Sequence, residues 1–237
     1  MVPYSLIPEL HYFRSCPHST TVRWGLHYKD VEHRLEHTSI LARKKLRQLS
    51  GQTWPPVLIH KGKAYTHQQA CTRYLESEFS EKPLTPKASD DYSEYFIVSH
   101  WVDRALHYVM VAIKYLNKQN FEVSKASILE DREPTLLNRL LVELAPMVQA
   151  NHLFHQDYVA SELPEIQRIL SECWRALDTR LKHHDFIVGN SLTYVDMQVY
   201  ANMKTMHGCV ELEEVETLPQ LREWKRRIET NYEWPHT

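Results

Sequence analysis

The first eighty residues alternate between short apolar stretches and helical patterns in an order that few folds accommodate. A strand pattern over residues 10–15 leads into a helix pattern beginning at Pro17, because proline suits the first helical turn, where its missing N–H has no partner anyway. Residues 31–37, with widely spaced apolar side chains, predict an edge strand. The basic, amphipathic residues 40–49 predict a second helix that ends at Gly51.

The next two strands are expected to form a hairpin. Residues 57–60 indicate a short buried strand entered through a proline pair, and residues 61–63 make a tight turn into residues 64–65. Thr66 is expected to cap a third helix over residues 68–78. The resulting order, strand–helix–strand–helix–strand–strand–helix, is typical of thioredoxin-like folds.

Cys16 stands between the first strand and the first helix. Unpaired N–H groups and the helix dipole favour an anion at that position. Thiols placed there can have pKa values lowered to roughly 3.5–7.5, which leaves a thiolate at neutral pH. Arg14 and Arg23 would add to this effect. The alternative is a buried cysteine that only happens to precede a helix.

Beyond a polar, proline-bearing stretch the pattern becomes helical throughout. We expect a first domain over residues 1–79, a linker over residues 80–89 and an all-helical domain over residues 90–237. The long apolar-rich segment 90–117 predicts a central helix buried on several sides. The polar residues 119–132 are expected to form a loop. Further helices are predicted over residues 134–144, 163–181, 195–206 and 218–228.

Composition excludes several classes of partner. A net charge of −2 gives no electrostatic basis for binding nucleic acid or an anionic membrane surface. The sequence contains no apolar run of about eighteen residues, so it predicts no membrane span, and the first residues lack the pattern of a secretory signal. The four cysteines, at positions 16, 71, 173 and 209, are widely separated. That spacing is typical of a reducing compartment, so we expect a cytoplasmic protein.

Two histidine clusters invite a metal-site interpretation. His152 and His155 would share a helix face near Asp157, and residues 183–185 form a second cluster. Neither supplies a full ligand set at the spacing of a zinc site, so no metal is predicted.

Several motifs carry a resemblance to a known family. They are the Cys-Pro-His-Ser run at residues 16–19, the strand entry at residues 56–58, the segment 65–75, and residues 185–196. The last segment is similar to a phenylalanine-x-x-glycine … threonine-x-x-aspartate signature in which Asp196 reaches back to the cap of its helix. Together they resemble the glutathione transferase family over nearly the whole chain. The resemblance implies an α/β N-terminal thioredoxin-like domain followed by an all-α C-terminal domain.

The resemblance also implies a mechanism. Cys16 matches the thiol of the cysteine-type, omega-like classes, which forms a mixed disulfide with glutathione. Ser19 stands where a two-cysteine motif keeps its resolving thiol, so a second glutathione would have to release the first. Ser19 and Arg14 are candidates for supporting the thiolate. The implied activity is glutathione-dependent thiol transfer, reduction or deglutathionylation, with small electrophiles or mixed disulfides as substrates.

The expected glutathione-binding residues are Pro55, Pro56, His67 and Gln68. Pro56 matches the family's cis-proline, but Pro55 has no N–H, so one expected backbone bond to glutathione must be missing. His67 and Gln68 replace the family's usual glutamate or glutamine followed by serine. The start of the third helix would still attract the γ-glutamyl carboxylate, to which Gln68 can donate.

These substitutions keep a second function open, that of a non-catalytic member of the family acting in protein interaction or stress response. The resemblance further implies a two-fold homodimer, in which the helix from Asp90 and the third helix near Arg73 meet the partner.

Overall fold

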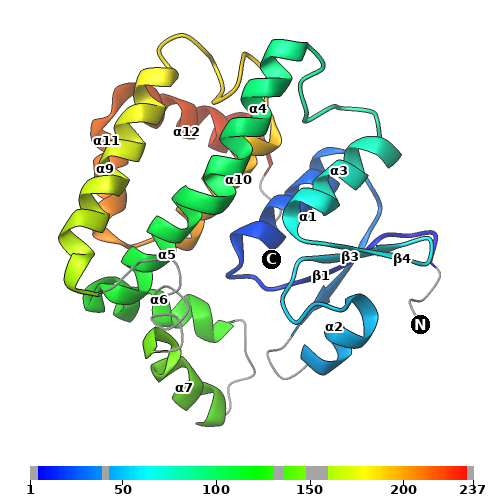
Figure 1. Ribbon diagram of the computed structural model, residues 1–237, viewed down its shortest axis with the longest axis horizontal. Coiled ribbons are helices and arrows are strands. Elements are labelled where there is room, and N and C mark those ends of the chain that lie inside the picture. Colours follow the sequence, from blue (N-terminus) through cyan, green and yellow to red (C-terminus); the bar gives the residue numbers. More distant parts are fainter. Residues whose placement is uncertain (1–4, 39–42, 131–135, 148–159, 234–237) are drawn as a thin grey trace.

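The computed structural model describes residues 5–38, 43–130, 136–147 and 160–233. A small mixed sheet lies beside a larger group of helices, with α1 and α3 on one face of the sheet and α2 on the other (Figure 1). The elements of this first half are β1 (Glu9–Tyr12), α1 (Pro17–Tyr28), β2 (Arg34–His37), α2 (Arg43–Ser50), β3 (Val57–His60), β4 (Lys63–Thr66) and α3 (Gln68–Glu78). The predicted order of elements is confirmed.

The sheet has the strand order β2-β1-β3-β4. β1 pairs with β2 in parallel, whereas the β1–β3 and β3–β4 pairs are antiparallel. Lys61 and Gly62 both have positive φ angles, +48° and +72°, which a two-residue turn between twisted strands requires. The hairpin was therefore correctly predicted from its glycine.

The expected cap of α3 was wrong. Thr66 pairs with Val57 as the last residue of β4, so its backbone belongs to the sheet. His67 takes the N-cap position instead, with φ +63° and ψ 146°, and its side chain makes no capping hydrogen bond. Non-glycine residues rarely adopt this backbone conformation, and such residues cluster at functional sites.

The second half is helical. Its elements are α4 (Ser89–Trp101), the π-helical η2 (Val102–Leu106), α5 (His107–Leu116), α6 (Lys118–Glu130), α7 (Leu136–Glu143), η3 (Ala160–Glu162), α9 (Leu163–Arg180), α10 (Tyr194–Thr205), η4 (Val210–Leu212), α11 (Glu213–Thr217) and α12 (Pro219–Asn231). The long helix predicted over residues 90–117 is present as α4, η2 and α5 in direct succession. The helix predicted from Pro134 appears as α7, and Pro134 itself lies outside the described residues.

The expectation of a loop over residues 119–132 was wrong, because α6 occupies most of this segment. The side chain of Asn117 caps this helix by accepting hydrogen bonds from the N–H groups of Gln119 and Asn120, at 3.0 and 3.4 Å. Phe121 and Ile128 are buried in a cluster with Val142 of α7. A few apolar side chains among polar ones are enough for a helix when a neighbouring helix covers them.

The predicted capping motif of α10 is confirmed, and it reaches further than the sequence indicated. Asp196 accepts hydrogen bonds from the N–H and the hydroxyl of Thr193, at 2.9 and 2.8 Å. Its other oxygen accepts from the N–H of Ile187 and the indole of Trp224, both at 2.9 Å. Burial raises the pKa of this carboxyl, while the four donated bonds act in the opposite direction. Asp196 thus joins α10 to α12.

The two halves share a continuous interface along α1 and α3. Trp24 of α1 is buried in the core of the helical half and packs against Tyr200, with ring centroids 5.7 Å apart. Gln69 of α3 donates to Ser99 of α4 at 2.9 Å, and Ser99 donates to Gln198 of α10 at 3.0 Å. Within the described residues, no helix has the length and apolar character needed to cross a membrane.

Candidate functional site

Cys16 is the N-cap of α1, as predicted. Its backbone is extended (φ −96°, ψ 112°), and Pro17 follows in the first turn. The N–H of Cys16 donates to the carbonyl of Phe13 at 3.3 Å, and its carbonyl accepts from the N–H of Thr20 at 3.0 Å. This turn ends β1 and starts α1, so the half-buried thiol sits at the positive end of the helix.

The other three cysteines have a different environment. All four, which lie within the described residues, are thiols and not disulfides. Burial raises the pKa of Cys71 to about 12 and that of Cys173 to about 11, and it also raises the pKa of Cys209. These three thiols are therefore protonated at neutral pH, as expected for packed side chains.

The start of α3 meets the start of α1. The Nδ1 atom of His18, two residues after Cys16, lies 3.0 Å from Oε1 of Gln68, the first residue of α3. Gln68 is buried, at 4% exposure, and its Nε2 atom has no hydrogen-bond partner among the described residues. The N-termini of α1 and α3, whose first N–H groups have no partner within their own helices, therefore meet at the His18–Gln68 contact, two residues after Cys16.

A carboxylate from the helical half completes this arrangement. Asp103 Oδ1 lies 3.5 Å from the same Nδ1 atom of His18. The ring of His18 also packs on that of His107, with centroids 4.3 Å apart. Asp103 belongs to η2 and His107 is the first residue of α5, so the centre of the long helix faces the Cys16 turn. π-Helical turns inside α-helices are frequent at functional sites.

The proline pair lies at the same end of the sheet. The Pro55–Pro56 bond is cis, as predicted, and both residues are buried. The following residue, Val57, pairs with His11 near the end of β1, the strand that leads to Cys16. Trp54, just before the pair, is 49% exposed. Its ring packs on that of Phe13 in a T-shaped arrangement, with centroids 5.7 Å apart. Cys16, Pro56 and Gln68 thus come from three connections at one edge of the sheet.

The other residues predicted to support the thiolate or to bind glutathione differ in how far they are buried. Ser19, in the first turn of α1, is fully buried, and its hydroxyl has no hydrogen-bond partner among the described residues. Arg14 is exposed, next to the turn. Arg23 lies over the ring of Tyr12 at 5.6 Å. His67 contacts Gln52 at 3.2 Å on the surface, beside the start of α3.

His18, Asp103 and His107 were missed by sequence reasoning. His18 was visible as part of the Cys-Pro-His-Ser run, but nothing in the pattern indicated which groups it would contact. Asp103 lies in the π-helical η2 and His107 directly follows it, and nothing in the pattern of residues 90–117 distinguished either position.

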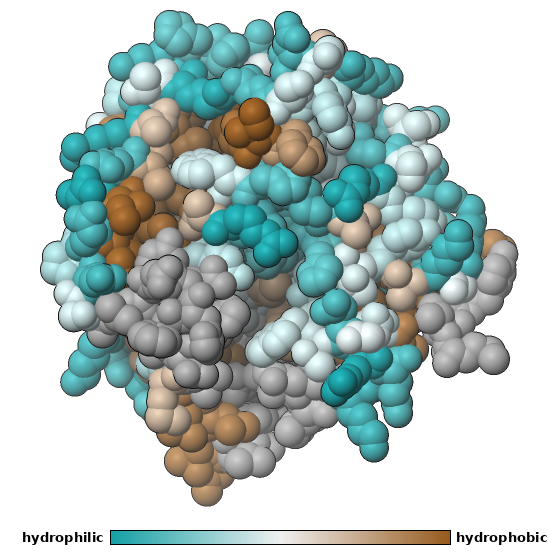
Figure 2. Space-filling model, in the orientation of Figure 1, coloured by the Kyte–Doolittle hydropathy of each residue, from teal (hydrophilic) through white to brown (hydrophobic). Residues whose placement is uncertain are grey.

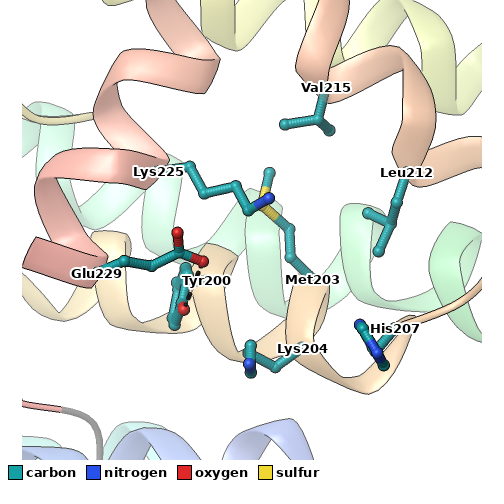
Figure 3. Close-up of a pocket in the computed structure, with 8 residues that line it drawn as sticks. All are labelled: Tyr200, Met203, Lys204, His207, Leu212, Val215, Lys225 and Glu229. Atoms are coloured by element: carbon teal, nitrogen blue, oxygen red, sulfur yellow. Dashed lines mark hydrogen bonds between the residues drawn. The ribbon is translucent and has the colours of Figure 1, made fainter.

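A separate pocket of about 210 Å³ lies in the helical half, between α10, α11 and α12 (Figure 3). Met203, Leu212 and Val215 supply apolar walls, while Lys204, His207, Lys225 and Glu229 supply charge or polarity around them. Its lining includes none of the residues predicted for the glutathione site.

In the described part of the chain, no three His, Cys, Asp or Glu side chains are grouped so that they could hold a metal ion. His152, His155 and Asp157, one of the two clusters considered as metal ligands, lie outside the described residues.

Comparison with known families agrees with the fold. Residues 10–83 match the glutathione S-transferase N-terminal domain, and residues 149–233 match the glutathione S-transferase C-terminal domain. The two domains occur in the order that the two halves of the structure show. The chain belongs to the glutathione S-transferase family.

Solved structures of similar fold have low sequence identity. A glutathione S-transferase from Rhodospirillum rubrum aligns with a TM-score of 0.68 at 16% identity, covering 95% of this chain and 89% of the other. The beta-etherase LigF from Sphingobium aligns at 0.71 and 19%, covering 94% and 95%. A glutathione transferase homologue from Drosophila mojavensis with bound glutathione aligns at 0.62 and 13%, covering 95% and 89%. No curated protein sequence matches the chain significantly. These likenesses show the glutathione transferase fold.

Proposed function

We propose that this protein is a glutathione-dependent thiol transferase of the cysteine type, with Cys16 as its nucleophile. The observation that carries the proposal is the convergence of two helix N-termini through the His18–Gln68 contact. One N-terminus stabilises a thiolate at Cys16, and the other, with the unpartnered amide of Gln68, suits the γ-glutamyl carboxylate of glutathione.

The reaction balances without a second protein thiol. The Cys16 thiolate attacks the glutathione sulfur of a mixed disulfide, the substrate's S–S bond breaks, and the substrate leaves as a thiolate that takes a proton from water. A second glutathione thiolate then attacks the Cys16–glutathione disulfide. Oxidised glutathione departs, and Cys16 returns as the thiolate. Ser19 stands where a resolving cysteine would otherwise compete with this second step.

A reducing compartment such as the cytoplasm, where glutathione keeps thiols reduced, suits this chemistry. We further propose a homodimer. The outward face of α4 carries the exposed apolar side chains Tyr92, Phe96 and Ile97, and Arg73 is exposed on α3. Apolar side chains are visible over α4 and α7 in the space-filling view (Figure 2). A contiguous exposed apolar face on a helix is typical of an interaction surface.

The competing function, a non-catalytic family member that binds other proteins, is favoured by one observation. Pro55 lacks the N–H that a residue before the cis-proline would donate to glutathione, so the site offers one backbone bond fewer.

Mass spectrometry of the intact protein after incubation with a glutathione mixed disulfide separates the two functions. The wild type should gain one glutathione at Cys16 and should catalyse disulfide exchange, whereas Cys16→Ala should do neither. Cys173→Ala, which removes a half-buried thiol elsewhere, is the matched control and should behave as the wild type. Exchange activity in Cys16→Ala, or no adduct on the folded wild type, would contradict the thiol-transferase proposal.

A further inference from the structure

We propose that His18 and Asp103 hold the side-chain amide of Gln68 in the orientation that presents its Nε2 hydrogens to a ligand carboxylate. The inference rests on the proposed glutathione site and assigns it two positioning residues, one of them from the helical half of the protein.

The tautomer of His18 follows from its neighbours. Its Nδ1 atom faces both the Gln68 oxygen, at 3.0 Å, and the Asp103 carboxylate, at 3.5 Å. An ionised carboxylate can only accept a hydrogen bond, so the nitrogen that faces it carries the hydrogen. An Nδ1–H in turn requires the amide of Gln68 to face it with oxygen and not with nitrogen. Asp103 therefore sets the tautomer of His18, and His18 sets the orientation of the Gln68 amide.

The opposite side of that amide is the part that meets a ligand. With Oε1 turned to His18, Nε2 points away from it, and Nε2 is buried with no hydrogen-bond partner among the described residues. A buried N–H group without an acceptor costs free energy, which an anionic acceptor would recover. Since Gln68 is the first residue of α3, the N–H groups of that helix start are available to the same anion. A ligand carboxylate can accept hydrogen bonds both from Nε2 of Gln68 and from these backbone N–H groups.

The helical half anchors the far side of this Asp103–His18–Gln68 relay. The other oxygen of Asp103 lies 3.1 Å from Nε of Arg104. His107, which packs on His18, donates from Nδ1 to the Asn202 oxygen at 2.9 Å, and Asn202 itself donates to the carbonyl of Gln198 at 2.8 Å. α10 thus supports the His18 ring through His107, and the affinity for the carboxylate depends on both halves of the protein.

Calorimetric titration with two probes tests the relay in the full-length protein. One probe is glutathione, and the other is γ-aminobutyryl-cysteinylglycine, which lacks only the γ-glutamyl carboxylate. His18→Phe keeps a ring but loses the donor, and it should weaken glutathione binding by about tenfold. His18→Asn keeps a donor near the position of Nδ1 and should restore binding to within about threefold of the wild type. The affinity for the analogue should be the same in all three proteins. His100→Phe, the same substitution on the outer face of α4, is the matched control and should change neither affinity.

Equal weakening of both probes by His18→Phe would show that His18 acts only through packing, and no change in either would show that it does not act at all. Either result overturns the relay, as does an absence of glutathione binding to the wild type. Repeating the titrations in Cys16→Ala separates this inference from the thiol-transferase proposal. The dependence on His18 should persist there, because carboxylate binding does not need the thiol.

Discussion

The backbone of Gly25 in α1 lies directly against the ring of Tyr194 in α10, so that a Cβ at position 25 would stand 2.7 Å from Tyr194 Cε1. Tyr194 is almost fully buried, and α10, of which it is the first residue, carries the Asp196 network. The missing side chain at position 25 therefore sets how closely the thioredoxin-like half approaches the helical half.

Gly25→Ala should destabilise the protein by about 1–3 kcal/mol, because the added methyl overpacks this contact. On an exposed helix position the same change would instead stabilise by up to about 1 kcal/mol. Urea unfolding of Gly25→Ala, Tyr194→Leu and the double variant measures the coupling. We expect the double variant to be more stable than the sum of the single effects predicts, and strict additivity would contradict the close contact.

Alkylation at pH 7 should label Cys16 before the other three cysteines. Burial raises the pKa of Cys71 to about 12 and that of Cys173 to about 11, and it also raises the pKa of Cys209, so these thiols have little thiolate to react. Peptide mapping after brief treatment with iodoacetamide measures the order of labelling. Cys16→Ser should remove the early label, and early labelling of Cys173 would contradict the assignment.

Acidification should destabilise the protein in part through His33. Burial lowers the pKa of His33 below its ordinary value of 6.5, although its hydrogen bond to the carbonyl of Val31, at 2.7 Å, acts in the opposite direction. The unfolded chain consequently binds more protons than the folded one just below pH 6.5. The free energy of unfolding therefore rises with pH through this range and falls on acidification.

His33→Asn should reduce the slope of the melting temperature between pH 7 and pH 5, because the titrating group is gone. The matched control is His183→Asn, at an exposed position. An unchanged slope in His33→Asn, or an equal reduction in the control, would show that His33 is not responsible.

Ile97→Lys should convert the proposed dimer into a monomer. Ile97 is 68% exposed on the apolar face of α4, and a lysine there would place charge in the middle of the interface. Leu140→Lys is the matched control, since Leu140 is 55% exposed on α7. Light scattering of the wild type and both variants measures the mass. A monomeric wild type, or dissociation caused only by Leu140→Lys, would contradict an interface along α4.

Much of this fold is determined by local signals in the sequence. Pro17 after Cys16 starts α1, Gly62 permits the hairpin, and the Thr193–Asp196 pair caps α10. Each depends on groups within a few residues of one another, so the physical cause is visible in the order of amino acids. The thioredoxin-like order of elements and the helix-capping cysteine follow from such signals.

Other features depend on partners that are remote along the chain. α6 forms because Phe121 and Ile128 are covered by α7, and Thr66 joins β4 because Val57 pairs with it. Tertiary burial and strand pairing outweigh local propensity in both cases. The candidate site shows the same division. The sequence alone indicated Cys16 and Gln68. Only the folded chain brings His18 and Asp103 to them, because hydrogen bonds between distant residues depend on how the two halves pack and leave no periodicity in the sequence.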